Sequence, residues 1–315
     1  MVMLLVVTLV FGLMVGGFIG IERGIPFEKQ IDEWSIGIYE GQSPLKLAPS
    51  PNVNNPVLTA KDVTDTEAEF LADPFMIMKD STWYLFFELF NTRTKQGDIA
   101  CATSVNGFDW IYKKIVLDEP FHLSYPYVFE YEGEYYLIPE SCNSYSIRLY
   151  KAIDFPTQWS FCGILLSGRF FDSSIFYHNG LWWLFTTDRN DVLRLFYADK
   201  LIGSFTEHPK SPLIIGNEHI ARPGGRVITF ESRILRFAQD DYLTYGNRLR
   251  AFEVTTLTTV NYEEKEVTDM FPLQATGNGW NALGMHNVDP HQISENKWIA
   301  CVDGYRRKLV FGWGY

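Results

Sequence analysis

Hydrophobic and polar residues alternate in short runs along most of this chain, which is the period of a β-strand with one buried face. Aromatic runs such as Tyr135-Tyr136-Leu137 and Trp182-Trp183-Leu184 follow turns that contain glycine or asparagine. No long stretch beyond the N-terminal segment keeps the apolar spacing of an amphipathic helix. The pattern therefore predicts an all-β fold over the greater part of the chain.

One phrase recurs along these segments: a polar residue opens a strand, and an aromatic strand ends about 15 residues later. The copies cover residues 71–88, 123–140, 170–187, 220–239 and 287–303. We call the third position of each copy the slot; the slots hold Asp73, Tyr125, Asp172, Arg222 and Asp289. Slots 52, 47, 50 and 67 residues apart are typical of four-stranded propeller blades. Five copies predict a five-bladed β-propeller, in which equivalent positions face one central channel.

The ends of the chain are expected to close this ring. We expect a connector with one ring-closing strand over residues 22–70 and the five-bladed propeller over residues 71–315. Trp34–Tyr39 and Lys308–Trp313 both alternate like strands. Because a propeller closes by pairing strands from both ends of its sequence, we expect these two segments to complete the last blade together.

The N-terminal segment has a different character. Val2–Ile21 is a run of 20 uncharged, mostly apolar residues, which predicts a transmembrane helix over residues 1–21. A cleaved signal peptide and a mis-assigned start are the competing interpretations; no Lys or Arg precedes the run and no clear cleavage site follows it. The expected protein is single-pass in the membrane. The side of the propeller stays open, because positive charge is scarce on both flanks.

Composition narrows the range of partners and cofactors. The net charge of −11 argues against nucleic acid as a partner. The four cysteines show no CxxC pair, so they are buried thiols or include a disulfide. Gly224-Gly225 lies in no phosphate-binding motif, and His286 and His291 would point to opposite faces of a strand. We therefore expect no cofactor and no joint metal site, although His286 alone could meet a cation or a sugar hydroxyl.

The residues that could carry chemistry occupy the slots and the ends of the following strands. A hairpin returns the chain to where it began, so both sets should meet at the channel mouth. They are Asp73, Glu88, Tyr125, Glu140, Asp172, Arg222, Gln239, Asp240, Asp289 and Asp303. Acids that face each other across a cleft suit glycosidic-bond cleavage, in which one protonates the leaving oxygen and the other activates water or attacks the sugar. The plainer alternative is that each Asp-Pro only begins a strand.

Arg222 and Arg226 stand in the least typical copy, Arg222-Pro-Gly-Gly-Arg226. Two guanidinium groups near channel carboxylates either neutralise them or bind an anionic group such as a phosphate or a uronate. Both interpretations stay open.

Several of these phrases together resemble one known family. They are Ala72–Met76, Tyr84–Glu88, Ser124–Pro126, Ile138–Glu140, Ala221–Arg226 and Ala238–Asp240. The chain, over roughly residues 28–315, resembles the N-terminal five-bladed propeller domain of glucosamine inositolphosphorylceramide transferases and their bacterial relatives. That domain is in turn similar to the propellers of glycoside hydrolase families 43 and 32. The resemblance implies the fold more directly than an activity.

The resemblance also implies roles for single residues. Asp73 matches the first-blade aspartate that serves as base or nucleophile in the hydrolases, and Asp172 is a loose counterpart of their auxiliary acid. The family 43 general acid is a glutamate in the fourth blade, where this chain has Arg222; Glu140 or Glu88 would have to take its place. The resemblance does not reach the catalytic domain of the plant transferases, so it does not imply transferase activity.

Together these observations predict a membrane-anchored propeller that acts on, or binds, a cell-surface glycan or glycolipid. In the enzyme hypothesis, a glycoside-hydrolase-like site uses Asp73, Glu140 and Asp172 as catalytic residues. The expected substrate-binding residues are Glu88, Tyr125, Arg222, Arg226, Gln239, Asp240, His286 and Asp289. The alternative is a non-catalytic glycan-binding or scaffold module, which we expect if the carboxylates are all locked onto Arg222 and Arg226.

Overall fold

The computed structural model describes residues 8, 12, 14, 29–267 and 271–310. The predicted transmembrane helix over residues 1–21 lies almost entirely outside these residues, and within them no helix is long and apolar enough to cross a bilayer. The chain divides into a large unit, Trp34–Arg306, and a small unit made of the residues on either side of it. Within the small unit, Lys308 pairs with Glu33 at 2.8 Å and Arg307 with Asp32 at 3.3 Å.

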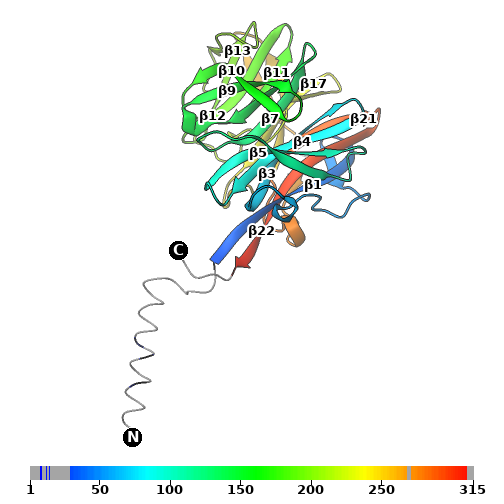
Figure 1. Ribbon diagram of the computed structural model, residues 1–315. Helices are drawn as coiled ribbons and strands as arrows, with labels where there is room; N and C mark the ends of the chain where they lie inside the picture. Colours follow the sequence, from blue (N-terminus) through cyan, green and yellow to red (C-terminus); the bar gives the residue numbers. More distant parts are fainter. Residues whose placement is uncertain (1–7, 9–11, 13, 15–28, 268–270, 311–315) are drawn as a thin grey trace. The chain divides into compact units, whose positions relative to one another are not determined.

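The described strands form five sheets, each one blade of a β-propeller (Figure 1). The first blade holds β3 (Ala68–Lys79), β4 (Thr82–Asn91), β5 (Gln96–Ser104) and β6 (Ile111–Leu117). The second holds β7 (Ser124–Tyr131), β8 (Glu134–Glu140), β9 (Ser146–Asp154) and β10 (Gln158–Ser167). The third holds β11 (Phe170–His178), β12 (Leu181–Asp188), β13 (Val192–Ala198), β14 (Thr206–Glu207) and β15 (Ile214–Ile215).

The last two blades are less regular. The fourth holds β16 (Ile228–Phe230), β17 (Arg233–Asp240), β18 (Arg248–Leu257), β19 (Tyr262–Glu266) and β20 (Leu273–Gln274). The fifth holds β1 (Lys29–Ser43), β2 (Lys46–Pro49), β21 (Val288–Ser294) and β22 (Lys297–Val310). Short 3₁₀ turns, η1 (Ala60–Asp62), η2 (Cys142–Ser144) and η3 (Gly279–Asn281), lie between strands. The predicted all-β, five-bladed propeller is confirmed.

The fifth blade joins the two ends of the sequence. Its strand order is β2-β1-β22-β21, so β1 (blue in Figure 1) hydrogen-bonds to β22 (red). The strand expected at Trp34–Tyr39 is part of β1. The C-terminal strand expected at Lys308–Trp313 is the end of β22, and its last three residues lie outside the described part of the chain. Pairing the first and last strands within one sheet leaves the ring without an open seam.

The hydrophobic core lies largely between neighbouring blades. Phe75 of β3 meets Tyr125 and Tyr127 of the second blade with ring centroids 4.8 and 5.1 Å apart, and Phe86 of β4 meets Trp159 of β10 at 5.5 Å. Such aromatic contacts each add about 0.5–1.5 kcal/mol beyond area burial. The high aromatic content of the sequence is therefore used to fix the blades against one another. Cys101, Cys142, Cys162 and Cys301 are all free, so the disulfide alternative is wrong.

The slots of the first three blades share one backbone geometry. Asp73, Tyr125 and Asp172 have φ angles of 52°, 44° and 44°, a region that few residues other than glycine adopt. Each of the three hairpins also shifts register at its slot, as in a β-bulge. Bulges turn side chains away from the regular alternation of a strand and recur beside functional sites. The repeat in the sequence is thus a repeat of backbone conformation at the inner edge of the blades.

Candidate functional site

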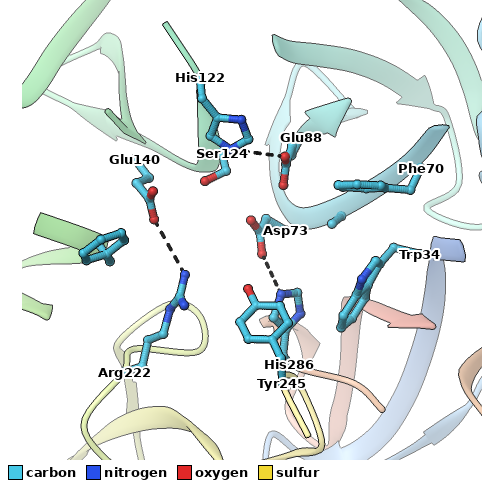
Figure 2. A pocket seen from close by; sticks show the side chains of 12 residues that line it. Trp34, Phe70, Asp73, Glu88, His122, Ser124, Glu140, Arg222, Tyr245 and His286 are labelled. Carbon is cyan, nitrogen blue, oxygen red and sulfur yellow. Dashed lines mark ion pairs between the residues drawn. The ribbon is translucent and has the colours of Figure 1, made fainter. Parts of the chain in front are cut away.

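A cavity of about 250 Å³ opens at the end of the propeller where the slots lie (Figure 2). Its lining comes from all five blades of the large unit: Trp34, Phe70, Ala72, Asp73, Glu88, His122, Ser124, Glu140, Phe171, Arg222, Tyr245 and His286. Five of the residues expected from the sequence therefore reach one cavity, namely Asp73, Glu88, Glu140, Arg222 and His286. Volumes near 300 Å³ are at the lower end for small-molecule sites, so the cavity suits one sugar ring rather than a chain.

Three carboxyl groups from the first two blades turn toward this space (Figure 2). Asp73, Glu88 and Glu140 are only 5, 6 and 9% exposed. Burial raises the pKa of Asp73 to about 7, although the charge of His286 opposes it. Burial also raises the pKa of Glu88 and of Glu140 well above the usual glutamate range, with neighbouring carboxylates adding to both shifts. The cavity thus combines two glutamates whose burial favours the protonated form with an aspartate that is partly ionised at neutral pH.

The bulged slots are held by hydrogen bonds between blades. The backbone N–H of Asp73 donates to Asp303 Oδ2 at 3.0 Å, and that of Tyr125 donates to Asp73 Oδ2 at 3.2 Å. The N–H of Asp172 points at Glu140 Oε2 at 3.4 Å. The positive φ angle of each slot aims its N–H at an acid of the blade before it. Two strand-end acids, Asp303 and Glu140, and the slot acid Asp73 therefore each accept a backbone N–H from the next repeat.

His286 lies between two acids at one side of the cavity. Its Nδ1 is 2.8 Å from Asp303 Oδ2, and its Nε2 is 3.5 Å from Asp73 Oδ1. Burial lowers the pKa of His286, but the carboxylates of Asp303 and Asp73 outweigh it and raise the pKa to about 9. The ring is also stacked on Trp34, with centroids 4.2 Å apart. His286 is therefore a cation that favours the ionised form of Asp73.

The same three side chains bring their ligand atoms within 4.8 Å of one another, the spacing of a metal site. Both ring nitrogens of His286 already face carboxylates, however, and a protonated imidazole has no lone pair for a metal. Asp303 also accepts the backbone N–H groups of His286 and Asn287 at 3.0 and 2.9 Å. These groups fit a proton-sharing cluster better than a cation site.

Arg222 forms the opposite wall and is partly committed to acids. Its Nε donates to Asp172 Oδ2 at 2.5 Å, and its terminal nitrogen lies 3.7 Å from Glu140 Oε2. Gln239 also donates to Asp172 Oδ2, at 2.7 Å. Asp172 is 2% exposed and lies behind the cavity wall. The auxiliary acid expected from the sequence is therefore paired with the arginine, and Gln239 supports that pair without lining the cavity.

Arg226 and Asp289 lie apart from the cavity lining. Arg226 makes a two-bonded pair with Asp289, at 2.5 and 3.2 Å, and also donates to the carbonyl of Val128. Gly225 lets the backbone beside Arg226 pack directly against Val288. Its φ is 140°, and a Cβ at this position would come within 1.9 Å of the carbonyl oxygen of Val288. Asp289 also accepts the N–H of Met76. The structure therefore places both predicted binding residues, Arg226 and Asp289, in an ion pair outside the cavity lining that links different blades; we call it the closed pair.

Tyr125 and Asp240 also have structural partners. The Tyr125 hydroxyl accepts the N–H of Gly225 at 2.6 Å and lies 2.9 Å from Ser174 Oγ. Asp240 is fully buried and accepts hydrogen bonds from Arg248 and Arg250 at 2.8 and 2.9 Å. The structure therefore does not bring these two predicted binding residues to the cavity.

The residues that sequence reasoning missed are mostly aromatic or adjacent to slots. They are Trp34, Phe70, His122, Ser124, Phe171 and Tyr245. Ser124 and Phe171 immediately precede slots, so a signal for them was present in the repeat. Trp34 comes from β1 and Tyr245 from the β17–β18 loop, and neither belongs to a repeated position. Only the closure of the propeller places these two side chains beside the carboxyl groups of the cavity.

The sequence from residue 28 to residue 305 matches the family described as "Glucosamine inositolphosphorylceramide transferase 1, N-terminal". The chain belongs to this family. It is 36% identical over 311 residues to glucosamine inositolphosphorylceramide transferase 1 of Oryza sativa subsp. japonica, covering 89% of this chain and 42% of the relative. The Arabidopsis thaliana protein of that name is 36% identical over 299 residues, with 87% and 39% covered. The predicted resemblance is confirmed, and the chain spans about two fifths of these relatives.

Solved structures show the fold in several carbohydrate-active proteins. The β-1,2-mannobiose phosphorylase of Listeria innocua aligns with a TM-score of 0.62 and 14% identity, over 84% of this chain and 96% of that chain. The GH62 α-L-arabinofuranosidase domain of Coprinopsis cinerea aligns at 0.57 and 13%, over 89% and 97%. The family 117 glycoside hydrolase Zg3597 of Zobellia galactanivorans aligns at 0.54 and 14%, over 89% and 91%. At such low identities the likeness concerns the fold alone.

Proposed function

We propose that the cavity binds one sugar of a cell-surface glycan or glycolipid and that the propeller hydrolyses the glycosidic bond of that sugar. The observation that carries the proposal is the group of buried carboxyls, Asp73, Glu88 and Glu140, around a cavity of about 250 Å³. Aromatic side chains such as Trp34 and Phe171 supply apolar surface for a sugar ring beside these acids. Membership of a family named for a glucosamine-transferring, sphingolipid-related enzyme supports a glycolipid as the ligand class.

The proposed reaction divides the work between Glu140 and Asp73. Burial raises the pKa of Glu140 and so favours its protonated form, which donates its proton to the leaving glycosidic oxygen. Asp73, with a pKa of about 7 and a cationic neighbour, accepts a proton from the attacking water or itself attacks the anomeric carbon. Two carboxyls with unlike environments are what such acid–base assignments require.

Glu140 is preferred to Glu88 as the acid because of its neighbours. The guanidinium of Arg222 lies 3.7 Å from Glu140 and offsets the negative charge that remains after proton transfer. Glu88 faces His122 at 3.4 Å, and burial lowers the pKa of that histidine, so His122 is neutral at pH 7. Glu88 is proposed as a hydrogen-bonding partner of the sugar.

One observation favours the alternative, a glycan-binding module without catalysis. Asp172, the expected auxiliary acid, is held by Arg222 at 2.5 Å and lies behind the cavity wall. A propeller that uses its acids only to accept hydrogen bonds from sugar hydroxyls would tolerate this pairing.

The two functions are separated by comparing binding with turnover. We expect the full-length protein to bind members of a glycan array and to release a reducing sugar from the glycans that it binds. Asp73→Asn and Glu140→Gln should retain binding but lose about 10²–10⁴-fold of the turnover. Glu295→Gln, which changes an exposed acid far along β21–β22, is the matched control. Binding without turnover in the wild type rejects hydrolysis, and absence of both rejects a glycan site.

We also propose that Val2–Ile21 anchors the propeller to a membrane, with the run of 20 uncharged residues as its support. The full-length chain should stay in the membrane fraction after extraction at alkaline pH, and a chain without residues 2–21 should be released. Release of both would exclude the anchor.

A further inference from the structure

The loop between β17 and β18, residues 241–247, carries a side chain into the cavity that no repeat predicts. Both ends of the loop are pinned. Asp241 Oδ1 accepts the N–H of Gly246 at 2.7 Å, and the ring of Tyr242 stacks on His219 with centroids 4.4 Å apart. Between these anchors, Leu243 has a φ of 74° and is 82% exposed. A bulky residue in that conformation at an exposed tip indicates a loop shape that the surrounding contacts impose.

Tyr245 is the residue that this loop presents to the cavity. Its ring meets Trp34 and His286 edge-on, with centroids 6.1 and 5.2 Å apart, and the guanidinium of Arg222 lies 5.3 Å from the ring centre. Figure 2 shows the hydroxyl turned into the cavity on the side of Asp73. Within residues 29–267 and 271–310, no group is in hydrogen-bond contact with this hydroxyl.

The chemistry of that hydroxyl points to a ligand. Burial raises the pKa of Tyr245 well above its ordinary value, and the nearby carboxylates of Asp73 and Asp172 add to the shift, so the phenol keeps its proton. Tyr245 is 48% exposed, but its hydroxyl is turned into the cavity, where a ligand rather than a protein group can accept its proton. The charged groups of the cavity face acids or bases of the protein, whereas Tyr245 has a neutral donor to offer.

We propose that Tyr245 is the specificity-determining residue of the cavity, donating its hydroxyl proton to a sugar oxygen that lies against Asp73. This inference rests on the proposed glycan site. A sugar hydroxyl at that position accepts from Tyr245 and donates to the Asp73 carboxylate, so both protein groups are paired at once. A sugar without that hydroxyl leaves Tyr245 without an acceptor and Asp73 with only its partners inside the protein, so the site should bind it less tightly.

Gly246 explains how the loop can lie so close to the cavity wall. Its φ is 68°, and a Cβ at this position would approach Cη2 of Trp34 to 2.5 Å and Cβ of His286 to 3.4 Å. Adding one methyl group here must displace the loop or Trp34. Gly277 offers a matched comparison, since its φ is 77° and a Cβ there would meet nothing within 4 Å.

The first experiment measures equilibrium binding of free glucosamine, N-acetylglucosamine, glucose, mannose, galactose, arabinose and xylose to the full-length protein. We expect Tyr245→Phe to weaken the best-bound sugar about tenfold without changing the melting temperature. One monodeoxy analogue of that sugar should lose the same factor with the wild type and nothing further with Tyr245→Phe. Tyr242→Phe, in the same loop but with its ring on His219, should bind as the wild type does.

The outcomes distinguish this inference from the function on which it rests. Equal affinity of wild type and Tyr245→Phe for every sugar rejects the role of Tyr245 while the glycan site stands. Failure of the wild type to bind any of the sugars rejects the proposed site, and the role of Tyr245 with it.

The second experiment uses the two glycines. Both Gly246→Ala and Gly277→Ala place alanine at a positive φ and should lower the melting temperature, Gly246→Ala by more because its Cβ also clashes with Trp34. Only Gly246→Ala should weaken sugar binding, by at least the factor seen with Tyr245→Phe, because only it moves Tyr245. Equal binding by the two alanine variants would show that the loop position is unimportant for the ligand.

Discussion

Arg222 and Arg226 are four residues apart in one turn, yet they belong to different kinds of site. Arg226 is closed on Asp289 by two hydrogen bonds, and the side chain of Asp289 is completely buried. Arg222 pairs with Asp172 too, but it also lines the cavity and lies 3.7 Å from Glu140, another residue of the cavity lining. Both pairs join an arginine to an aspartate of another blade. What differs is whether the ion pair leaves part of its hydrogen-bonding capacity facing a space that a ligand can enter.

The comparison carries over to the slot residues. Asp73 faces the cavity from the first blade. Tyr125 has the same backbone conformation in the second blade, but its hydroxyl is hydrogen-bonded to Gly225 and Ser174. One repeated conformation therefore places a side chain in the cavity lining in one blade and in blade-to-blade packing in the next. The sequence repeat marks where the backbone has a bulge. The contacts with the neighbouring blade determine whether the side chain at that bulge lines the cavity or is buried between blades.

The largest expected effect would test the closed pair directly. Arg226→Met should lower the free energy of unfolding by about 3–5 kcal/mol, because the buried carboxylate of Asp289 loses both arginine hydrogen bonds and keeps only His291 and the N–H of Met76. Arg222→Met should cost less, since Asp172 keeps the hydrogen bond from Gln239. Urea denaturation of the two variants measures the difference. The double change Arg226→Met with Asp289→Asn should recover part of the loss, and equal losses for the two single variants would remove the distinction drawn here.

The two regions should also respond to pH in opposite directions. The pKa of Asp289 is lowered from 3.8 to about 2 by Arg226 and His291, against the effect of burial, so its stabilisation is present above pH 3.8 and lost as pH falls through 2. That loss amounts to about 2 kcal/mol. Asp289→Asn should flatten this acid limb in unfolding curves measured from pH 2 to 5. An unchanged acid limb in Asp289→Asn would contradict the assignment.

Two residues of the cavity, Asp73 and His286, should determine how the free energy of unfolding falls as the pH rises. Burial raises the pKa of Asp73 from 3.8 to about 7, so the stability that its protonated form contributes below pH 3.8 declines as pH rises toward 7. The pKa of His286 is raised from 6.5 to about 9 by Asp303 and Asp73, despite burial, so its contribution is complete below pH 6.5 and lost as pH passes 9. His286→Gln should remove the histidine's part of the decline between pH 6.5 and 9 and shift the decline due to Asp73 to higher pH, whereas Asp289→Asn should leave both in place.

A smaller effect should separate the two slots. Tyr125→Phe should cost about 1–2 kcal/mol of unfolding free energy, because the buried N–H of Gly225 loses its acceptor. Asp73→Asn should change stability less but abolish the proposed turnover. Thermal unfolding and product release, measured on both variants, test this division of roles. A loss of turnover in Tyr125→Phe equal to that of Asp73→Asn would place Tyr125 in the functional site after all.

The smallest effect should come from ion pairs at the surface. Lys151 and Glu134 are 3.1 Å apart but have side chains 39 and 49% exposed. Lys151→Gln should therefore change the free energy of unfolding by less than about 0.5 kcal/mol. A loss close to that of Arg226→Met would show that burial is not what separates these pairs.

The sequence by itself determined the all-β class, the five blades and the strand order within a blade. It also indicated that the carboxyl groups of Asp73, Glu88 and Glu140 lie near one another at the mouth of the channel. These follow from alternation over two residues and from spacing along the chain, which are local properties. Only the tertiary structure decided which partners the two arginines have: Arg226 pairs with Asp289, and Arg222 pairs with Asp172. It also decided that Trp34 and Tyr245 reach the cavity. Those outcomes depend on distances between side chains on different blades, which ring closure sets and no local pattern encodes.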